Sequence, residues 1–411
     1  MFLKFNFFNW INNYFIKFYS IFFNKKMHLI KENMIMVIVC KHDLIFKKKS
    51  FEIKLLHNLL KEFKKKEKKD YFIVFHKYTY FDQKKFSNKN YLINNLFFFI
   101  NDHLKITLKF FGVNFSREKN YWNKILKKYK PSVIFTISAP EDILELVENK
   151  KIPLYEFQHG IIDTKINYFK NLIAFLKKNK KSRFVKFIAW NKSSKIYFDR
   201  KVKRNVSLIF KDPHLDFQLE LKCKFNKKVI LISLANNLEY FYKLYKIKSN
   251  LVKFTLPKFL INFIKKDKNY IWIFRFHPSQ SHNKKMFNNS WQLKLIKEIF
   301  DKVKHVYFDY KFSISNLKSA IMIANYHIAD SSAALITSKN LNVNSGCWNK
   351  LFSSDKQRVD QFNLSKNSIM SISNENKLNL FLNKYEKKKI KLQPKIFDHT
   401  KFIKLLNIRK I

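Results

Sequence analysis

Short apolar runs alternate with longer amphipathic stretches along most of the chain. Runs rich in Val, Ile and Phe are typical of strands buried on both faces, and the stretches between them are long enough for helices. This alternation predicts parallel sheets with crossover helices, which is an α/β fold. In the first half of the chain the predicted strands are MIMVIVC (34–40), YFIVFHK (71–77), SVIFTI (132–137), IPLYEF (152–157) and FVKFIAW (184–190).

The segment SAPEDILELVENK, between the third and fourth of these strands, predicts a helix. Ser138 can cap this helix and Pro140 suits its first turn. Glu141 and Asp142 complement the positive end of the helix dipole. The strand, the helix and the next strand form the clearest βαβ unit of the sequence.

A second series of apolar runs follows a polar, charge-rich segment around residues 211–228. The predicted strands here are VILISL (229–234), YIWIFRF (270–276), HVYFDY (305–310) and AIMIANYHIA (320–329). Two such series predict two α/β domains with a boundary near residues 215–226. In open α/β sheets, ligands bind beyond the carboxyl ends of the strands, so residues at strand exits are the candidates for chemistry.

The predicted organisation has four parts. They are an aromatic N-terminal segment (1–30), a first α/β domain (31–218), a second α/β domain (219–375) and basic C-terminal helices (376–411). Polar residues such as Lys4, Asn6 and Lys17 interrupt the N-terminal segment, so it lacks the run of about 20 apolar residues that spans a membrane. Its aromatic and basic side chains suit peripheral membrane contact, with an ordinary packed helix as the alternative.

Composition adds two constraints. The chain has 3 glycines in 411 residues, where ordinary usage predicts about 29, so each remaining glycine carries more information than usual. The formal net charge of +52 favours anionic partners, although lysines spread along the whole chain also fit codon bias on solvated faces. Because no RNA-reading motif or zinc-finger spacing is present, we expect no specific nucleic acid partner.

The cysteines and the hydrophobic content indicate a folded protein of a reducing compartment. Cys40, Cys223 and Cys347 are odd in number and widely separated, which argues against a disulfide framework. Hydrophobic residues make up 46% of the chain, enough for well-formed cores. We therefore expect a cytoplasmic protein.

The motif Gln158-His159-Gly160 follows the predicted strand 152–157. A glycine here allows a positive φ or a close approach of the backbone to a ligand, and we expect the turn to tolerate nothing larger. An imidazole at this exit can serve as a general base near neutral pH. Glu156 and Asp163 flank the histidine and could orient it. The alternative is a surface turn with an incidental histidine.

Two further motifs follow strands in the second half. Arg275 and His277 are two residues apart, which places both on one side of an extended strand, and Pro278 ends that strand. Such a pair suits a phosphate or pyrophosphate, with a structural His-Pro turn as the alternative. The second motif, IADSSAALITSK (328–339), runs from a strand into a helix through Asp330, Ser331 and Ser332. Either serine at the helix N-terminus would bind an anion there, or would only cap the helix.

With these motifs in place, the chain resembles bacterial GT-B glycosyltransferases of capsule, O-antigen or lipooligosaccharide assembly. The resemblance is carried by the Gln-His-Gly motif, the Arg-x-His-Pro motif and the Ser-Ser helix start, and it covers about residues 130–345. The chain is also similar to teichoic-acid glycerophosphotransferases and, more distantly, to bacterial sialyltransferases. The resemblance implies two Rossmann-like domains facing across a cleft. The second domain would hold the nucleotide-activated donor and the first would admit the acceptor.

The resemblance also implies a role for each motif residue. His159 would be the catalytic base that deprotonates the acceptor hydroxyl. Arg275 and His277 would neutralise the donor phosphate as it leaves, and Ser331 and Ser332 would hold the same phosphates. The nucleotide sugar is then a substrate, and the reaction needs neither a cofactor nor a metal, because side chains and a helix terminus stabilise the leaving charge.

The sequence departs from these families at several positions. Sialyltransferases have a carboxylate where this chain has Gln158 or His159, and glycerophosphotransferases usually continue His-Gly with Thr-Pro, where this chain has Ile161 and Ile162. Many GT-B enzymes use a glutamate early in the helix after the serines to hold ribose, and the corresponding stretch here offers Thr337. The donor nucleotide therefore stays open.

These inferences predict a metal-independent glycosyltransferase that moves a sugar from a nucleotide donor to a bacterial surface glycan. A glycan or lipid-linked acceptor at the inner face of the cytoplasmic membrane suits both the basic charge and the aromatic N-terminal segment. Two alternatives stay open. One is transfer of a polyol phosphate from a CDP-glycerol-type donor to a teichoic-like polymer. The other is a non-catalytic basic protein that binds nucleic acid or membrane.

Overall fold

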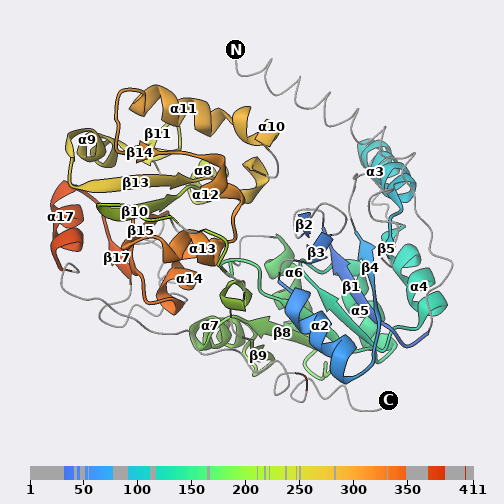
Figure 1. Cartoon of the computed structure of the whole chain (residues 1–411). Coiled ribbons are helices and arrows are strands. Elements are labelled where there is room, and N and C mark those ends of the chain that lie inside the picture. Colours follow the sequence, from blue (N-terminus) through green and yellow to red (C-terminus); the bar gives the residue numbers. More distant parts are fainter. Residues whose placement is uncertain are drawn as a thin grey trace.

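The computed structural model of the chain contains two α/β domains (Figure 1). The residues that it describes are 32–40, 44–46, 51–53, 55–76, 91–111, 117–163, 167–210, 212–216, 219–221, 223–236, 238–246, 248–249, 251–281, 284–330, 332–348, 369–384 and 403. The segment 1–30, for which membrane contact is predicted, lies outside these ranges.

The first domain is built on a seven-stranded sheet with the order β5-β4-β1-β6-β7-β8-β9. All of its pairings are parallel. Its strands are β1 (Ile35–Val39), β4 (Tyr71–Phe75), β5 (Tyr91–Leu92), β6 (Val133–Thr136), β7 (Leu154–Phe157), β8 (Val185–Ala189) and β9 (Ser207–Ile209). The strand order reverses at β1, so the gap between β1 and β6 is the topological switch point at which open α/β sheets bind ligands.

Apolar side chains on both faces of this sheet explain why its strands are buried throughout. All five residues of β1 are buried, and they alternate between two core clusters, with Val37 in one and Ile38 in the other. The helices of this domain are α2 (His57–Lys66), α3 (Asn95–Phe110), α4 (Glu118–Tyr129), α5 (Glu141–Asn149), α6 (Asn167–Lys178) and α7 (Lys192–Val202). A two-stranded antiparallel pair, β2 (Leu44–Phe46) with β3 (Phe51–Ile53), lies beside the sheet.

The second domain is built on a six-stranded parallel sheet with the order β14-β13-β10-β15-β16-β17. Its strands are β10 (Lys228–Ser233), β13 (Tyr270–Arg275), β14 (Val306–Tyr307), β15 (Tyr326–Ala329), β16 (Asn344–Cys347) and β17 (Ile369–Ser371). This is the strand order 3-2-1-4-5-6 of a dinucleotide-binding fold, and its switch point lies between β10 and β15.

The second sheet also carries helices on both faces. They are α8 (Leu238–Leu244), α9 (Lys258–Lys266), α10 (Lys284–Asn288), α11 (Trp291–Phe300), α12 (Tyr310–Ile314), α13 (Leu317–Met322), α14 (Ala334–Asn340) and α17 (Glu375–Lys384). The 3-10 helices η3 (Pro213–Asp216) and η4 (Pro278–Gln280) and the pair β11 (Leu251–Val252) with β12 (Leu256–Pro257) complete the described elements. Helix α17, in the predicted basic C-terminal part, packs Leu378 and Phe381 into the core of this domain.

Every apolar run that was predicted as a strand contains an observed strand, but two of the runs also include helical residues. The run 320–329 begins inside α13 and becomes β15 only at Tyr326, and the run 305–310 ends at the first residue of α12. A short apolar run has the same composition in a buried helix and in a buried strand, so periodicity does not separate them. In the two parallel sheets, β5, β9, β16 and β17 were not predicted, and neither were the strands of the two antiparallel pairs.

The predicted helix after β6 is present, but Ser138 does not cap it. Helix α5 begins at Glu141 with Pro140 in the N-cap position and no side-chain cap. Ser138 instead has a left-handed backbone with φ of 65°. Glu141 and Asp142 lie in the first turn as expected.

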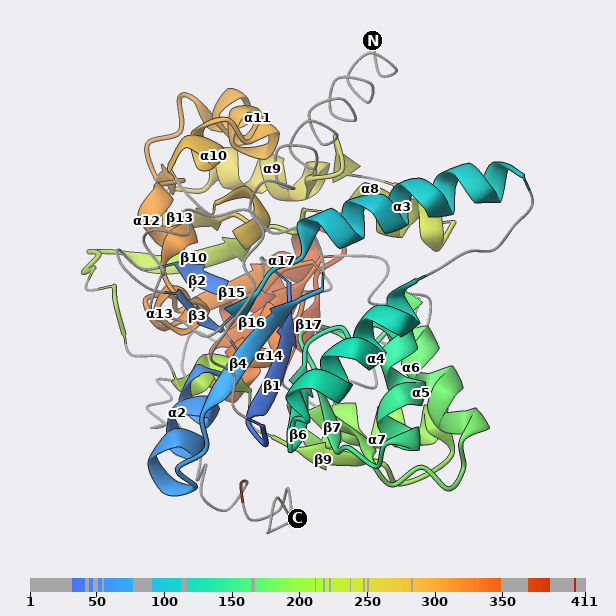
Figure 2. The ribbon, with the colours of Figure 1, turned by 90° about the vertical axis from the view of Figure 1, so that its right-hand side faces the viewer.

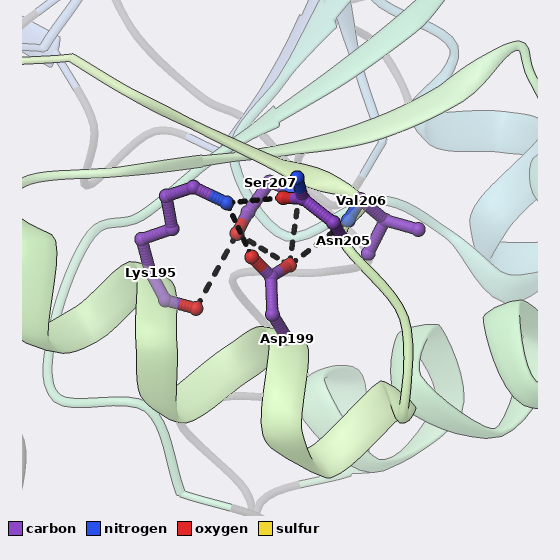
Figure 3. Close-up of polar contacts among 5 residues, drawn as sticks. All are labelled: Lys195, Asp199, Asn205, Val206 and Ser207. Carbon is purple, nitrogen blue, oxygen red and sulfur yellow. Dashed lines mark hydrogen bonds and ion pairs between the residues drawn. The ribbon is translucent and has the colours of Figure 1, made fainter.

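A half-buried carboxylate, that of Asp199, links α7 to the edge strand β9 (Figure 3). Asp199 Oδ1 accepts hydrogen bonds from the backbone N–H groups of Val206 and Ser207, both at 3.0 Å, and from Ser207 Oγ at 2.7 Å. Its other oxygen pairs with Lys195, which also donates to Asn205. One side chain thus satisfies the backbone at the start of the strand.

The two domains meet along the carboxyl edges of their sheets (Figure 1). One continuous cluster of buried apolar side chains contains Phe157 and Trp190 from the first domain and Ala329 and Cys347 from the second. Phe157, Ala329 and Cys347 are the last residues of β7, β15 and β16. The strand exits of one domain therefore lie towards the strand exits of the other.

Helix α3 extends beyond the β5 edge of the first sheet (Figures 1 and 2). Its inner side is polar in part, since Asn101 and Lys105 both contact Glu118. Several apolar side chains on and after it are exposed, among them Ile106 at 71% and Phe111 at 70%. None of the helices in the described ranges, α3 included, combines the length and the apolar character that crossing a bilayer requires.

Candidate functional site

His159 lies just beyond the carboxyl end of β7 and is half-buried. Its Nε2 atom is 3.3 Å from Ser138 Oγ. Its ring is stacked on Phe169 of α6, with centroids 6.0 Å apart and an angle of 12° between the planes. Because Ser138 follows β6, these contacts hold the imidazole beside the switch point of the first sheet.

Glu156 orients this region through the backbone. Its carboxylate is buried and accepts hydrogen bonds from the N–H groups of Ser138 at 2.7 Å and Ala139 at 3.0 Å. These bonds fix the left-handed residue that contacts His159. Glu156 therefore positions Ser138, the residue whose hydroxyl contacts the imidazole.

Gln158 is fully buried and holds the loop after β7. Its Nε2 donates to Gly160 O at 2.8 Å and to Ser194 Oγ at 3.3 Å, and its Oε1 accepts from Trp190 N at 2.9 Å. Both ends of the amide are therefore engaged within the protein. Gln158 therefore holds in place the backbone segment that contains His159.

Gly160 is not required by the fold, which corrects the expectation that its turn tolerates nothing larger. Its φ lies outside the left-handed region, and a Cβ atom built on it would meet nothing within 4 Å. Gly346 is the opposite case, because a Cβ there would lie 2.2 Å from Ile372 Cδ1. The backbone at Gly160 thus borders open space next to His159.

Arg275, the last residue of β13, carries a buried positive charge. Its Nη2 donates to Ser315 O at 3.1 Å, while its Nε is buried with no hydrogen-bond partner. Burial lowers the pKa of Arg275 to about 10, which leaves it charged near neutral pH. Within the described ranges no carboxylate pairs with this guanidinium.

A buried histidine that the sequence analysis did not select lies near Arg275. His327 of β15 contacts Ser233 Oγ through Nε2 at 2.9 Å and Ser338 Oγ through Nδ1. Because Ser338 donates its own proton to Ala334 O, Nδ1 is the donor and Nε2 accepts from Ser233. Burial, together with the charge of Arg275, lowers the pKa of His327 to about 3, so the ring is neutral. The sequence signal that could have selected His327 is a histidine within an apolar predicted strand.

His277 and Arg275 lie in different environments, contrary to the expectation that they share one side of a strand. The strand ends at Arg275, and the chain turns into the 3-10 helix that begins at Pro278. Arg275 is buried while His277 is exposed. The ladder of β13 already ends at Arg275, so Pro278 does not end it, which corrects the prediction; Pro278 instead opens η4. The roles of these residues towards a ligand stay predictions.

The Asp-Ser-Ser motif follows β15 beside the switch point of the second sheet. Asp330 is buried, its carbonyl accepts from Ser332 N at 2.7 Å, and Ser332 Oγ accepts from Ala334 N at 3.3 Å. Helix α14 starts at Ala334, later than the serines, and Ala333 is its N-cap. Ser331 lies outside the described residues. Thr337 is completely buried within α14.

The structure therefore assembles two groups of predicted residues, one at the carboxyl edge of each sheet. Glu156, Gln158, His159 and Gly160 form the first group. Arg275 and Asp330 lie at the exits of β13 and β15 and belong to the second, while His277 is exposed beyond them. Both groups lie on the edge where the domains meet.

Comparison with known proteins shows the fold and leaves the family open. No protein-family model matches the sequence, and neither does any curated protein. The solved UDP-GlcNAc 2-epimerase of Methanocaldococcus jannaschii, in complex with UDP-GlcNAc and UDP, is similar over 91% of this chain and 99% of its own, with a TM-score of 0.55 and 14% identity. The UDP-N-acetylglucosamine 2-epimerase of Rickettsia bellii is similar over 92% and 96%, with a TM-score of 0.51 and 14% identity.

A third solved structure, UDP-GlcNAc 2-epimerase from Neisseria meningitidis bound to UDP-GlcNAc, is similar over 92% of this chain and all of its own, with a TM-score of 0.50 and 11% identity. These likenesses extend over nearly the whole of each chain. Together with the two parallel sheets, they show that the protein has a GT-B fold of two Rossmann-like domains.

Proposed function

We propose that the protein is an enzyme that acts on a nucleotide-activated sugar, and that the nucleoside diphosphate part of this donor binds beyond the strand exits of the second domain. The observation that carries this proposal is the buried charge of Arg275, which has one carbonyl partner and no carboxylate within the described ranges. An isolated buried charge costs several kcal/mol unless an anion compensates it. A diphosphate at this edge supplies that anion.

The proposed reaction is glycosyl transfer to a bacterial surface glycan of the capsule, O-antigen or lipooligosaccharide kind. His159 takes the proton of the acceptor hydroxyl, whose oxygen bonds to the anomeric carbon of the donor. The bond from that carbon to the donor phosphate oxygen breaks, and its electron pair leaves with the diphosphate. Arg275 and His277 stabilise the departing charge, so no step runs through a metal or a cofactor.

A second candidate is epimerisation of a UDP-sugar. The observation that favours it is that the three solved structures named above are all UDP-GlcNAc 2-epimerases. Epimerisation converts UDP-GlcNAc into an isomer without an acceptor, whereas the transferase releases UDP only when an acceptor is present. Proton NMR of purified protein with UDP-GlcNAc alone therefore separates the two reactions.

The experiment that tests nucleotide binding compares UDP with uridine by calorimetry and thermal shift. UDP is expected to bind and to raise the unfolding midpoint, since a ligand at 100 times its Kd stabilises the native state by about 2.7 kcal/mol. Uridine, which lacks the diphosphate, is expected to have no effect at the same concentration. Equal effects of the two compounds, or no effect of UDP, CDP and GDP, would contradict a diphosphate site.

The base is tested by His159→Ala. This variant is expected to lose turnover of the donor, because a general base contributes about 10²- to 10⁴-fold to the rate. Its Kd for UDP is expected to stay within about threefold of the wild type. The control is His57→Ala, which replaces a partly exposed histidine of α2 that pairs with Glu52. If His159→Ala instead weakens binding of an anionic polymer such as single-stranded RNA, the non-catalytic basic protein is favoured.

We also propose peripheral contact with an anionic bilayer at the cytoplasmic face, supported by the net charge of +52 and the exposed apolar side chains of α3. Co-sedimentation with phosphatidylglycerol vesicles tests it. Ile106→Glu is expected to reduce the bound fraction severalfold. Ile196→Glu, which changes a 45% exposed isoleucine of α7, is the control and is expected to bind normally. Equal binding by both variants would remove α3 from the contact.

A further inference from the structure

A hydrogen bond joins the loop that carries His159 to the second domain. Tyr245 Oη donates to Asp163 Oδ2 at 2.5 Å. Asp163 is 3% exposed and lies four residues after His159, while Tyr245 follows the end of α8. A carboxylate removed from water depends strongly on such a donor, because a charged acceptor makes a stronger hydrogen bond than a neutral one.

The Tyr245 end of this contact is connected to the exit of β15. Tyr242, three residues earlier on α8, is buried, and burial together with the nearby Asp330 carboxylate raises its pKa to about 12. Residues three apart lie on neighbouring positions of a helix face. Helix α8 follows β10, the strand that pairs with β15, so it lies near the exit of β15 where the diphosphate is proposed to bind. Tyr245, just after the end of this helix, contacts Asp163 of the first domain.

The Asp163 end is braced against the core and so cannot move alone. Ile162 is 1% exposed and packs in the core cluster of the first domain, and Ile161 packs against the cluster shared by both domains. The carbonyl of Gly160 is held by Gln158. A displacement of Asp163 is therefore carried along a short and tightly held segment to His159.

We infer that the Tyr245–Asp163 hydrogen bond couples the nucleotide side of the protein to the catalytic loop. Tyr245 and Asp163 are positioning residues: they set where His159 lies relative to the donor and do not take part in the chemistry. Helix α8 transmits the state of the β15 exit to segment 158–163 of the first domain. This inference rests on the proposed function for the identity of the bound ligand, but the mechanical link itself does not depend on it.

The test is hydrogen–deuterium exchange of the full chain, read at peptides that cover residues 158–163, with and without UDP. Tyr245→Phe removes the donor and is expected to raise exchange in this segment about tenfold without ligand, the factor that corresponds to a hydrogen bond of ordinary strength. Tyr240→Phe, on the same helix and 57% exposed, is the matched control and is expected to match the wild type.

The UDP arm separates coupling from simple packing. UDP is expected to slow exchange at 158–163 in the wild type. In Tyr245→Phe it is expected to bind with a Kd within about threefold of the wild type but to leave that segment unprotected. Asp163→Asn keeps an acceptor oxygen, so a hydrogen bond remains, but it is weaker because the acceptor is neutral. The variant is therefore expected to show a smaller effect than Tyr245→Phe, which removes the bond.

The inference is overturned if exchange at 158–163 is the same in Tyr245→Phe, Tyr240→Phe and wild type, or if it rises equally over the whole chain. It is also overturned if UDP protects the segment in Tyr245→Phe as well as in the wild type. Failure of the wild type to bind UDP would instead contradict the proposed function, and the ligand-free comparison would still decide whether the hydrogen bond holds the loop.

Discussion

Two glycines show how a single residue separates the needs of folding from those of function. The chain has only 3 glycines, and Gly160 and Gly346 are two of them. Gly346 is explained by packing, since Ile372 occupies the space that a side chain would need. Gly160 has open space around its Cα and an ordinary φ, so the fold gives no reason for it. Close approach of a substrate beside His159 does give a reason.

This difference predicts opposite outcomes for the same substitution. Gly346→Ala is expected to lower the free energy of unfolding by about 1 to 3 kcal/mol, because the methyl group overpacks the core. Gly160→Ala is expected to leave it unchanged or to raise it slightly, since alanine restricts the unfolded chain, and to reduce donor turnover at least tenfold. Urea unfolding and turnover assays measure both. Normal turnover in Gly160→Ala would show that nothing approaches this backbone.

The neutral His327 predicts a pH dependence of stability. Its pKa is lowered to about 3 in the fold and returns to about 6.5 on unfolding. Above pH 6.5 both states are neutral and the full stability is present. Below it the unfolded state binds a proton that the folded state does not, so stability falls as the pH decreases towards 3, by about 2 kcal/mol at pH 5.

The measurement is urea unfolding at pH 7 and pH 5 for the wild type and for His327→Gln. The loss between the two pH values is expected to be about 2 kcal/mol smaller in the variant, whatever the cost of the substitution itself. An equal loss in both proteins would mean that His327 is protonated in the fold at pH 5.

At the scale of elements, the sequence predicts most strands but not where each one begins. The helix before β15 could have been found, because Asn316 caps it by accepting from Ser319 N at 2.8 Å, and that spacing is visible in the sequence. The strand β16 could not, because its residues Asn344–Cys347 are mostly small or polar. It is a strand because neighbouring strands and Ile372 enclose it, which is tertiary context.

The attachment of α7 to β9 gives a prediction at this scale. Asp199→Ala is expected to cost about 2 to 4 kcal/mol, because the N–H groups of Val206 and Ser207 lose their acceptor. Asp301→Ala, an exposed aspartate at the end of α11, is expected to change stability by less than about 0.5 kcal/mol. Chemical unfolding measures both variants. Equal stability of Asp199→Ala and the wild type would mean that water replaces the carboxylate without loss.

At the scale of the molecule, the pattern of apolar runs was sufficient to predict two parallel sheets. Most candidate residues were selected because they follow predicted strands. The pattern does not contain the contacts that cross between elements distant in sequence. The Tyr245–Asp163 hydrogen bond, the pairing of His159 with Ser138, and the isolation of Arg275 depend on how the loops fold over the strand ends. Such contacts become visible only in three dimensions.

The central claim is that a nucleotide diphosphate binds where the two carboxyl edges meet, against Arg275 and facing His159. A crystal structure of the chain with UDP tests it most directly. We expect the diphosphate beyond the ends of β13 and β15, with a phosphate oxygen within hydrogen-bonding distance of the Arg275 guanidinium. UDP bound elsewhere on the surface, or a guanidinium that remains out of reach of the bound phosphates, would contradict the account.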